Sequence, residues 1–132
     1  MREFNTEDIL AIAAFENLTG CEVRDYINGD TLYFLVGSGK AAMAIGKEGK
    51  NIKNAERILQ KPIKIFEFSE DTAQFVKNLI PQAQKVDLDG EKIVVNIPAK
   101  ERGIVIGRSG IKIKVIRELI ERNSNFKELK IL

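Results

Sequence analysis

Residues 45–52 read IGKEGKNI, and this stretch decides the fold of the segment around it. Two glycines lie three positions apart, and apolar residues at helical spacing lie on both sides of them. Glycine adopts backbone conformations that other residues avoid, so the pair predicts a tight loop between two helices. We expect a short helix over residues 40–44 and a longer one over residues 50–60, which Pro62 ends.

The same pattern returns 61 positions later, where residues 106–113 read IGRSGIKI. An offset of 61 aligns residues 27–59 with residues 88–120 without a gap, and six of the 33 aligned positions are identical. The identical positions include both glycines of the G-x-x-G motif. Self-similarity at a fixed offset indicates a duplicated module, here of about 65 residues.

Each copy predicts the element order helix, strand, strand, helix, helix, strand. Alternating or continuous apolar runs mark the strands, and the pairs Asn28-Gly29 and Asp89-Gly90 mark hairpin turns. We expect Thr6 and Ser69 to cap the first helix of each copy. The other expected elements are helices over residues 6–18, 101–105 and 112–122, a helix that Ser69 caps and Pro81 ends, with Glu70 and Asp71 in its first turn, and strands over 21–27, 32–36, 63–68, 82–87, 93–97 and 126–132. The predicted class is α+β (α/β), with helices packed on a three-stranded mixed sheet in each of two domains, residues 1–68 and 69–132.

The net charge is only +2, but the positive charge is concentrated. Residues 40–64 and residues 100–117 each carry a net charge of +5, so the other 89 residues sum to −8. Each basic segment surrounds one G-x-x-G motif. Solvated helix faces can carry such charge, but its place around both motifs favours an anionic partner.

A helix that starts at the second glycine directs its free N–H groups and its positive dipole end into the loop, which favours phosphate. Neighbouring lysines and arginines add charge, and isoleucines offer an apolar surface on which bases can lie. This combination suits a single-stranded nucleic acid. The candidate RNA-binding residues are Ile45, Gly46, Lys47, Glu48, Gly49, Lys50, Ile52, Lys53, Ile106, Gly107, Arg108, Ser109, Gly110, Lys112, Ile113 and Lys114. We expect the loops to hold the RNA backbone through glycine N–H groups and helix N-termini.

The motif I-G-x-x-G-x-x-I between two short helices resembles the KH RNA-binding motif, whose loop clamps four backbone nucleotides. A helix and a strand precede each motif, and about nine residues follow the last helix. That order resembles the type II KH arrangement. Tandem type II modules without a linker resemble the paired KH region of the NusA transcription factors, and a chain with nothing else resembles the short archaeal NusA-like proteins.

The resemblance implies a cytoplasmic, non-enzymatic factor that binds single-stranded RNA in transcription elongation, termination or antitermination. RNA polymerase or other transcription proteins would be its protein partners, although no residue of this chain specifies polymerase contact. We expect a monomer with no membrane association. Glu48 places a carboxylate in the first loop, so the second loop, with Arg108 and Ser109, is expected to bind phosphate more strongly.

Other readings have less support in the residues. The chain has no histidine and a single cysteine, Cys21, which excludes zinc fingers and Ser-His-Asp or Cys-His catalysis. Residues 37–42, GSGKAA, fit a dinucleotide fingerprint, but Gly46 and Gly49 interrupt the helix that such a site needs. No metal or organic cofactor is implied. Two alternatives stay open, namely ordinary helix-helix turns and a KH scaffold that docks on RNA polymerase or on a ribosomal or RNA-processing particle.

Overall fold

The computed structural model describes residues 3–132, and their contacts divide the chain into two compact units. Unit 1 ends at Ser69, and unit 2 runs from Glu70 to Leu132. The first two residues of the predicted first domain lie outside the described part. Each unit is described by itself.

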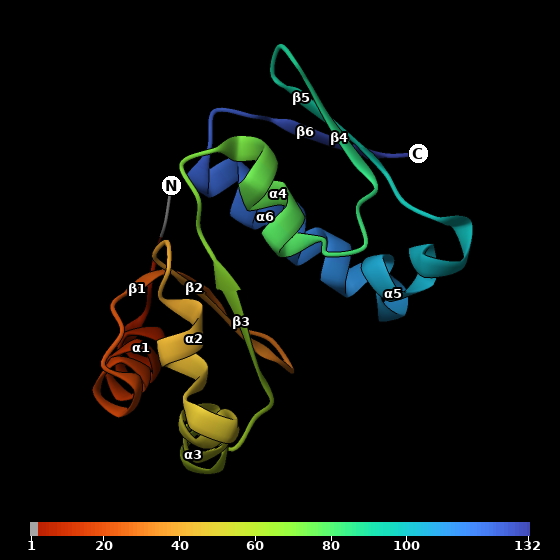
Figure 1. Cartoon of the computed structure of the whole chain (residues 1–132). Coiled ribbons are helices and arrows are strands. Elements are labelled where there is room, and N and C mark those ends of the chain that lie inside the picture. Colours follow the sequence, from red (N-terminus) through yellow and green to blue (C-terminus); the bar gives the residue numbers. More distant parts are fainter. Residues whose placement is uncertain (1–2) are drawn as a thin grey trace. The chain divides into compact units, whose positions relative to one another are not determined.

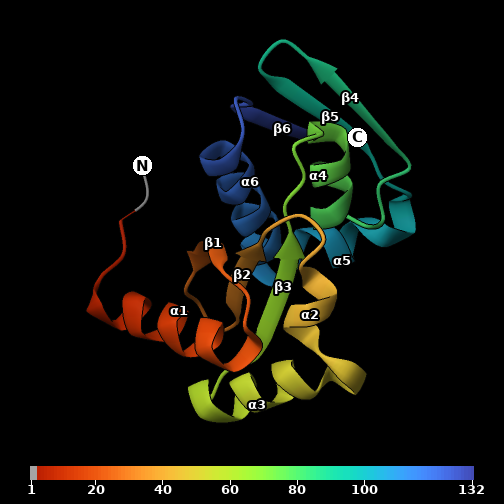
Figure 2. The same ribbon diagram turned by 60° about the vertical axis from the view of Figure 1, so that its left-hand side comes forward.

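Unit 1 has the element order that the sequence predicts (Figures 1 and 2). Strands β1 and β2 pair antiparallel, β2 and β3 pair parallel, and β2 is central. The expectation of a mixed sheet is therefore confirmed in this unit. In chain order the elements are α1 (Thr6–Thr19), β1 (Val23–Ile27), β2 (Leu32–Val36), α2 (Ala41–Ile45), the 3-10 turn η1 (Lys47–Gly49), α3 (Lys50–Leu59) and β3 (Ile63–Glu67).

The N-terminus of α1 differs from the prediction by one residue. Asn5, not Thr6, is the cap: its side chain accepts a hydrogen bond from the amide of Asp8 at 2.8 Å, and the Asp8 carboxylate accepts from the amide of Asn5 at 3.2 Å. Each side chain accepts a hydrogen bond from the backbone amide of the other residue, and this reciprocal arrangement is a capping box. Gly20 ends the helix with φ 73°, a conformation that favours glycine.

Aromatic rings fill the core of unit 1. Phe15 of α1 stacks on Phe34 of β2 with 4.0 Å between ring centroids, and Tyr26 of β1 lies 4.8 Å from Phe34. Phe15 and Phe34 are completely buried, and Tyr26 is nearly so. These contacts attach α1 to the two strands and leave α2 and α3 to form the face that carries the first G-x-x-G loop.

Burial raises the pKa of the Tyr26 hydroxyl to about 12, and the carboxylates of Asp8 and Glu7 contribute to the shift. Because the neutral phenol is favoured in the folded protein, its stabilisation is complete below the ordinary tyrosine pKa of 10.0 and is lost as the pH rises towards 12. We expect the free energy of unfolding to fall across this range. Urea unfolding at a series of pH values measures this dependence. The free energy of unfolding of the Tyr26→Phe variant should fall less steeply with pH than that of the wild type. Equal slopes for the two proteins would contradict it.

Unit 2 repeats the order and the sheet topology of unit 1. Strands β4 and β5 pair antiparallel, β5 and β6 pair parallel, and β5 is central. In chain order the elements are α4 (Thr72–Leu79), β4 (Lys85–Asp89), β5 (Lys92–Asn96), the 3-10 turn η2 (Ala99–Glu101), α5 (Arg102–Ile106), the 3-10 turn η3 (Arg108–Gly110), α6 (Ile111–Asn123) and β6 (Glu128–Ile131).

Several boundaries in unit 2 differ from the prediction. Asp71, not Ser69, is the N-cap of α4, so Glu70 and Asp71 precede the helix instead of lying in its first turn. Strand β4 begins at Lys85 rather than at residue 82. The turn at Gly90, with φ 61°, sets the antiparallel register, so β4 extends to Asp89 opposite Lys92.

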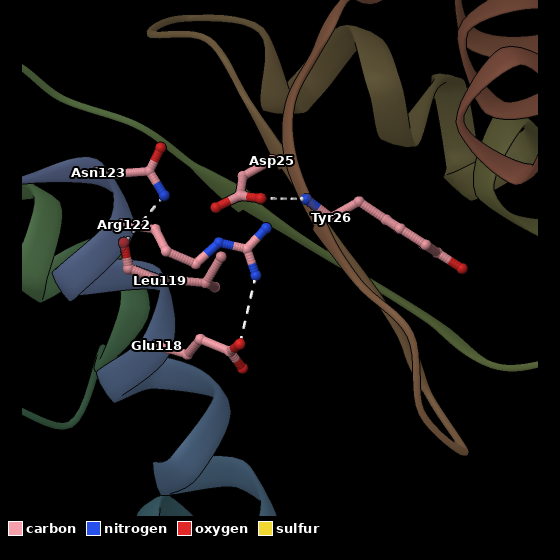
Figure 3. A network of polar contacts seen from close by, with 6 residues as sticks. All are labelled: Asp25, Tyr26, Glu118, Leu119, Arg122 and Asn123. Atoms are coloured by element: carbon pink, nitrogen blue, oxygen red, sulfur yellow. Dashed lines mark hydrogen bonds and ion pairs between the residues drawn. The ribbon is translucent and has the colours of Figure 1, made fainter. Parts of the chain in front are cut away.

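Local polar contacts occur within each unit, in β1 and in the last turns of α6, as Figure 3 shows. In unit 1, the buried Asp25 carboxylate accepts a hydrogen bond from the amide of Tyr26 at 2.8 Å, beside an irregularity in the pairing of β1 with β2. In unit 2, the last turns of α6 carry an ion pair between Arg122 and Glu118, with a 3.4 Å nitrogen–oxygen distance. The side chain of Asn123 donates to the carbonyl of Leu119 at 2.9 Å.

Candidate nucleic-acid interface

The first G-x-x-G loop, residues 46–49, has an unusual backbone. Gly46 has φ 80° and ψ 168°, a combination open almost only to glycine. Glu48 has φ 57° and Gly49 has φ 74°, both in the left-handed region. For Glu48 that conformation costs about 1–2 kcal/mol relative to a right-handed one. Helix α3 begins directly afterwards, at Lys50.

The second loop, residues 107–110, has the same backbone although two of its four residues differ. Gly107 has φ 78° and ψ 174°, Ser109 has φ 56°, and Gly110 has φ 73°. Helix α6 begins directly afterwards, at Ile111. Both units therefore hold a non-glycine residue in the left-handed region at the third loop position.

The two glycines of each loop have different roles. A Cβ atom on Gly107 would lie 2.6 Å from the Cβ of Lys112 and 3.0 Å from its amide nitrogen. A Cβ on Gly46 would lie 2.9 Å from the amide nitrogen of Asn51. The first glycine thus lets the loop contact the following helix. At Gly110 a Cβ would meet nothing within 4 Å, so this side of the loop is open to another molecule.

The glycine amides, which the sequence predicted as phosphate donors, have hydrogen-bond partners within the protein. The amide of Gly46 donates to the carbonyl of Ala42 at 2.9 Å, and the amide of Gly49 donates to Gly46 at 3.1 Å. In the second loop, the amides of Gly107 and Gly110 donate to the carbonyls of Gly103 and Gly107. These bonds fold the loop on itself, so the glycine N–H groups are used internally.

The amides that remain belong to the two central residues of each loop. Each loop forms a 3-10 turn, η1 or η3, and the first amides of a helical turn have no partner within it. These are the amides of Lys47, Glu48, Arg108 and Ser109. All four side chains are exposed. The loop centre thus presents both backbone donors and side-chain charge to solvent.

The isoleucines predicted to contact bases differ in their exposure to solvent. Ile45 and Ile106 are each 39% exposed, as a surface for bases requires. Ile52 is half-buried, and Ile113 is only 6% exposed. Ile113 therefore belongs mainly to the core of unit 2. The other predicted residues Lys50, Lys53 and Lys114 are exposed, and Lys112 is half-buried.

A polar hollow of about 480 Å³ lies beside the first loop. Four of the predicted residues line it together with Asn54, namely Lys47, Glu48, Lys50 and Lys53. Three ammonium groups and one carboxylate leave the hollow positively charged.

Unit 2 has instead a groove of about 550 Å³ between α5, α6 and the edge strand β6, within the usual size range of ligand sites. The predicted residues Ile106 and Ile113 line it. The remaining lining residues were not predicted as site residues: Lys92, Arg102, Arg117, Glu128, Leu129, Lys130 and Ile131. We call this the unit 2 groove.

The four cationic residues that line the unit 2 groove were not predicted as site residues, for two reasons. Arg102 and Arg117 lie inside the basic segment 100–117, and their helical spacing from the motif is the signal that could have found them. Lys92 and Lys130 come from β5 and β6, and their place depends on the parallel register that sets Lys130 beside Val94. The sequence does not reveal that register.

In the part of the chain that the structure describes, no group of three or more histidine, cysteine, aspartate or glutamate side chains could hold a metal ion. None of the helices over residues 3–132 is long and apolar enough to cross a membrane.

Fold and site together define an α+β protein with two three-stranded mixed sheets, consistent with KH-like modules that each present a basic glycine loop. Relatives are archaeal proteins, each called probable transcription termination protein NusA. The protein of Methanococcus vannielii is 34% identical over 98% of this chain and 79% of its own length. That of Methanocaldococcus jannaschii is 29% identical over 96% and 73%, and that of Thermoplasma acidophilum 27% over 96% and 93%. The chain belongs to this archaeal NusA family, as its resemblance indicated.

Among solved structures, the crystal structure of APE1850 is similar to this chain, with a TM-score of 0.75 and 28% sequence identity. The similarity covers 98% of this chain and 100% of that one. No model of a protein family matches the chain.

Proposed function

We propose that this protein is a transcription termination factor that binds single-stranded RNA through two type II KH domains, residues 1–68 and 69–132. Its relatives' shared name supports the role in transcription. The proposal of RNA binding rests on the two loops. They differ in sequence but adopt the same strained backbone, and each lies in a segment of net charge +5. Strain of this kind persists mainly where function requires it.

In the proposed mechanism the backbone of the RNA crosses each loop at its two central residues. Phosphates accept hydrogen bonds from the amides of the central loop residues, at the positive ends of α3 and α6. Arg108 and the lysines near the first loop supply charge. Ile45 and Ile106 provide the apolar surface next to the loops. The protein acts by binding and carries out no catalytic step, and it needs no cofactor.

A fluorescence-polarisation titration with short single-stranded RNA at several salt concentrations tests the proposal. We expect the logarithm of the binding constant to fall linearly with the logarithm of the salt concentration, with a slope of about −0.7 for each phosphate contacted. A variant with aspartate at positions 47, 48, 108 and 109 should lose this binding.

Two other outcomes would contradict the proposal. Wild-type protein that fails to bind RNA would favour a module that docks on other proteins of the transcription or ribosomal machinery. Binding that the four aspartates leave intact would place the RNA away from the loops. Circular dichroism of the variant is the control for folding, because all four positions are exposed.

A further inference from the structure

The unit 2 groove and the same region of unit 1 carry opposite charge at one equivalent position. Arg117 is the seventh residue of α6, and Glu56 is the seventh residue of α3. The offset of 61 that relates the two motifs also relates these two residues. Their helices begin at the same point relative to the loops, so both side chains leave the helix towards the edge strand of their own sheet.

The two side chains bond to opposite backbone groups of that edge strand. The Glu56 carboxylate accepts a hydrogen bond from the amide of Ile63, at the start of β3, at 2.9 Å. The Arg117 guanidinium donates to the carbonyl of Leu129, in β6, at 3.4 Å. Ile63 and Leu129 are equivalent, because each pairs with the equivalent residue of the central strand, Leu32 or Ile93. The acceptor in unit 1 is therefore replaced by a donor in unit 2.

The wall of the unit 2 groove therefore offers hydrogen-bond donors beside the carbonyl of Leu129. The bond to Leu129 uses one of the five N–H donors of the guanidinium, and 3.4 Å is longer than a strong N–H···O bond. The amides of Glu128 and Leu132 donate to Glu91 and Val95, on the side of β5. Because amides alternate along a strand, the amide of Leu129 points away from β5, towards Arg117.

The side chains that line the unit 2 groove carry a net positive charge. Lys92, Arg102 and Lys130 also line it, against the single carboxylate of Glu128. At the positions equivalent to Lys92, Arg102 and Arg117, unit 1 has Thr31, Ala41 and Glu56. Lys64 is equivalent to Lys130, so three of the four groove cations are specific to unit 2.

We propose that Arg117 determines base specificity in the unit 2 groove, selecting an RNA base that presents two adjacent acceptors. A planar guanidinium matches two neighbouring acceptors with two parallel hydrogen bonds. Guanine presents N7 and O6, and cytosine presents O2 and N3. Adenine sets its amino donor beside N1 and beside N7, and its N3 acceptor stands alone, while uracil separates its two carbonyls by an N–H group. This inference rests on the proposed function, since it concerns the RNA that unit 2 binds.

The test measures binding of the full chain to eight-nucleotide RNAs. The probes are oligomers of adenine, of uracil and of cytosine, and an adenine oligomer with one central guanine. We expect the cytosine oligomer and the guanine-containing oligomer to bind about tenfold more tightly than the adenine and uracil oligomers. Arg117→Met should reduce this ratio to about threefold or less. Arg117→Lys keeps the charge but lacks the planar fork, so it should lose preference while retaining most of the affinity.

Lys114→Met is the matched control, because it removes one positive charge from the exposed face of the same helix. It should weaken the binding of all four oligomers by a similar factor, as expected of a phosphate contact. A merely structural Arg117 would show a change in thermal stability with the base preference intact, which would overturn the inference. Equal affinity of the wild type for all oligomers would also overturn it, with RNA binding itself unaffected. Absence of binding to every oligomer would overturn both the inference and the proposed function.

Discussion

Replacing Gly107 by alanine is expected to lower the free energy of unfolding by about 3 kcal/mol or more, a large part of the stability of a small protein. Two costs combine at this position. The backbone has φ 78° and ψ 174°, which a residue with a Cβ avoids. The added Cβ would also lie 2.6 Å from the Cβ of Lys112, too close for any real contact. The loop or the first turn of α6 must then move.

Gly110→Ala is the matched control for this prediction. Gly110 lies in the same loop with φ 73°, but a Cβ there would meet nothing within 4 Å. Only the cost of the left-handed conformation remains, about 1–2 kcal/mol. Urea unfolding followed by circular dichroism measures both variants. Equal losses of stability would mean that the close approach to Lys112 contributes nothing.

Arg108→Asp is expected to weaken RNA binding by about 30- to 100-fold, which corresponds to about 2–3 kcal/mol. Lys47→Asp, with the same change in charge, should weaken binding less, by about tenfold or less. The reason is the neighbouring residue. Glu48 partly cancels the charge of Lys47 in the first loop, whereas Ser109 is neutral. The unit 2 groove also contains four cations near one carboxylate.

Glu48→Ser supplies the converse test, because it gives the first loop the neutral residue of the second. Affinity should rise about three- to tenfold as the repulsion of one phosphate by a carboxylate disappears. Titrations at one salt concentration, with RNA of one sequence, measure all three variants. The ranking is wrong if Arg108→Asp and Lys47→Asp lose similar affinity, or if Glu48→Ser changes nothing.

Element order and turns were predictable because local chemistry determines them. Gly46 and Gly49 interrupt a helical pattern, and Asn28-Gly29 and Asp89-Gly90 specify tight turns. The structure has the helix break and the first turn where they were expected. The second turn lies one residue later, at Gly90 and Glu91, because Asp89 still pairs with Lys92. Helix caps were less predictable, as Asn5 and Asp71 show, since each of them neighbours other polar residues that suit the cap position equally well.

The chemistry of the loops was predictable only in part. Their position before a helix and their positive charge follow from sequence spacing. The hydrogen-bond partners of the glycine amides do not follow from sequence spacing. They depend on backbone angles, which turn each amide towards a carbonyl of the preceding helix or loop. The proposed phosphate donors are therefore the amides of the central loop residues and not those of the glycines.

By itself, the sequence determined that this protein is a duplicated α+β module with a basic glycine loop in each copy. Periodicity, turn residues and charge spacing are local, so they can be read along the chain. Only the tertiary structure brought Arg117 and Glu56 to equivalent edge strands, with Lys92 and Lys130 beside the former. Those neighbours depend on the parallel register of β5 with β6 and of β2 with β3, in which hydrogen bonds join residues far apart in the chain.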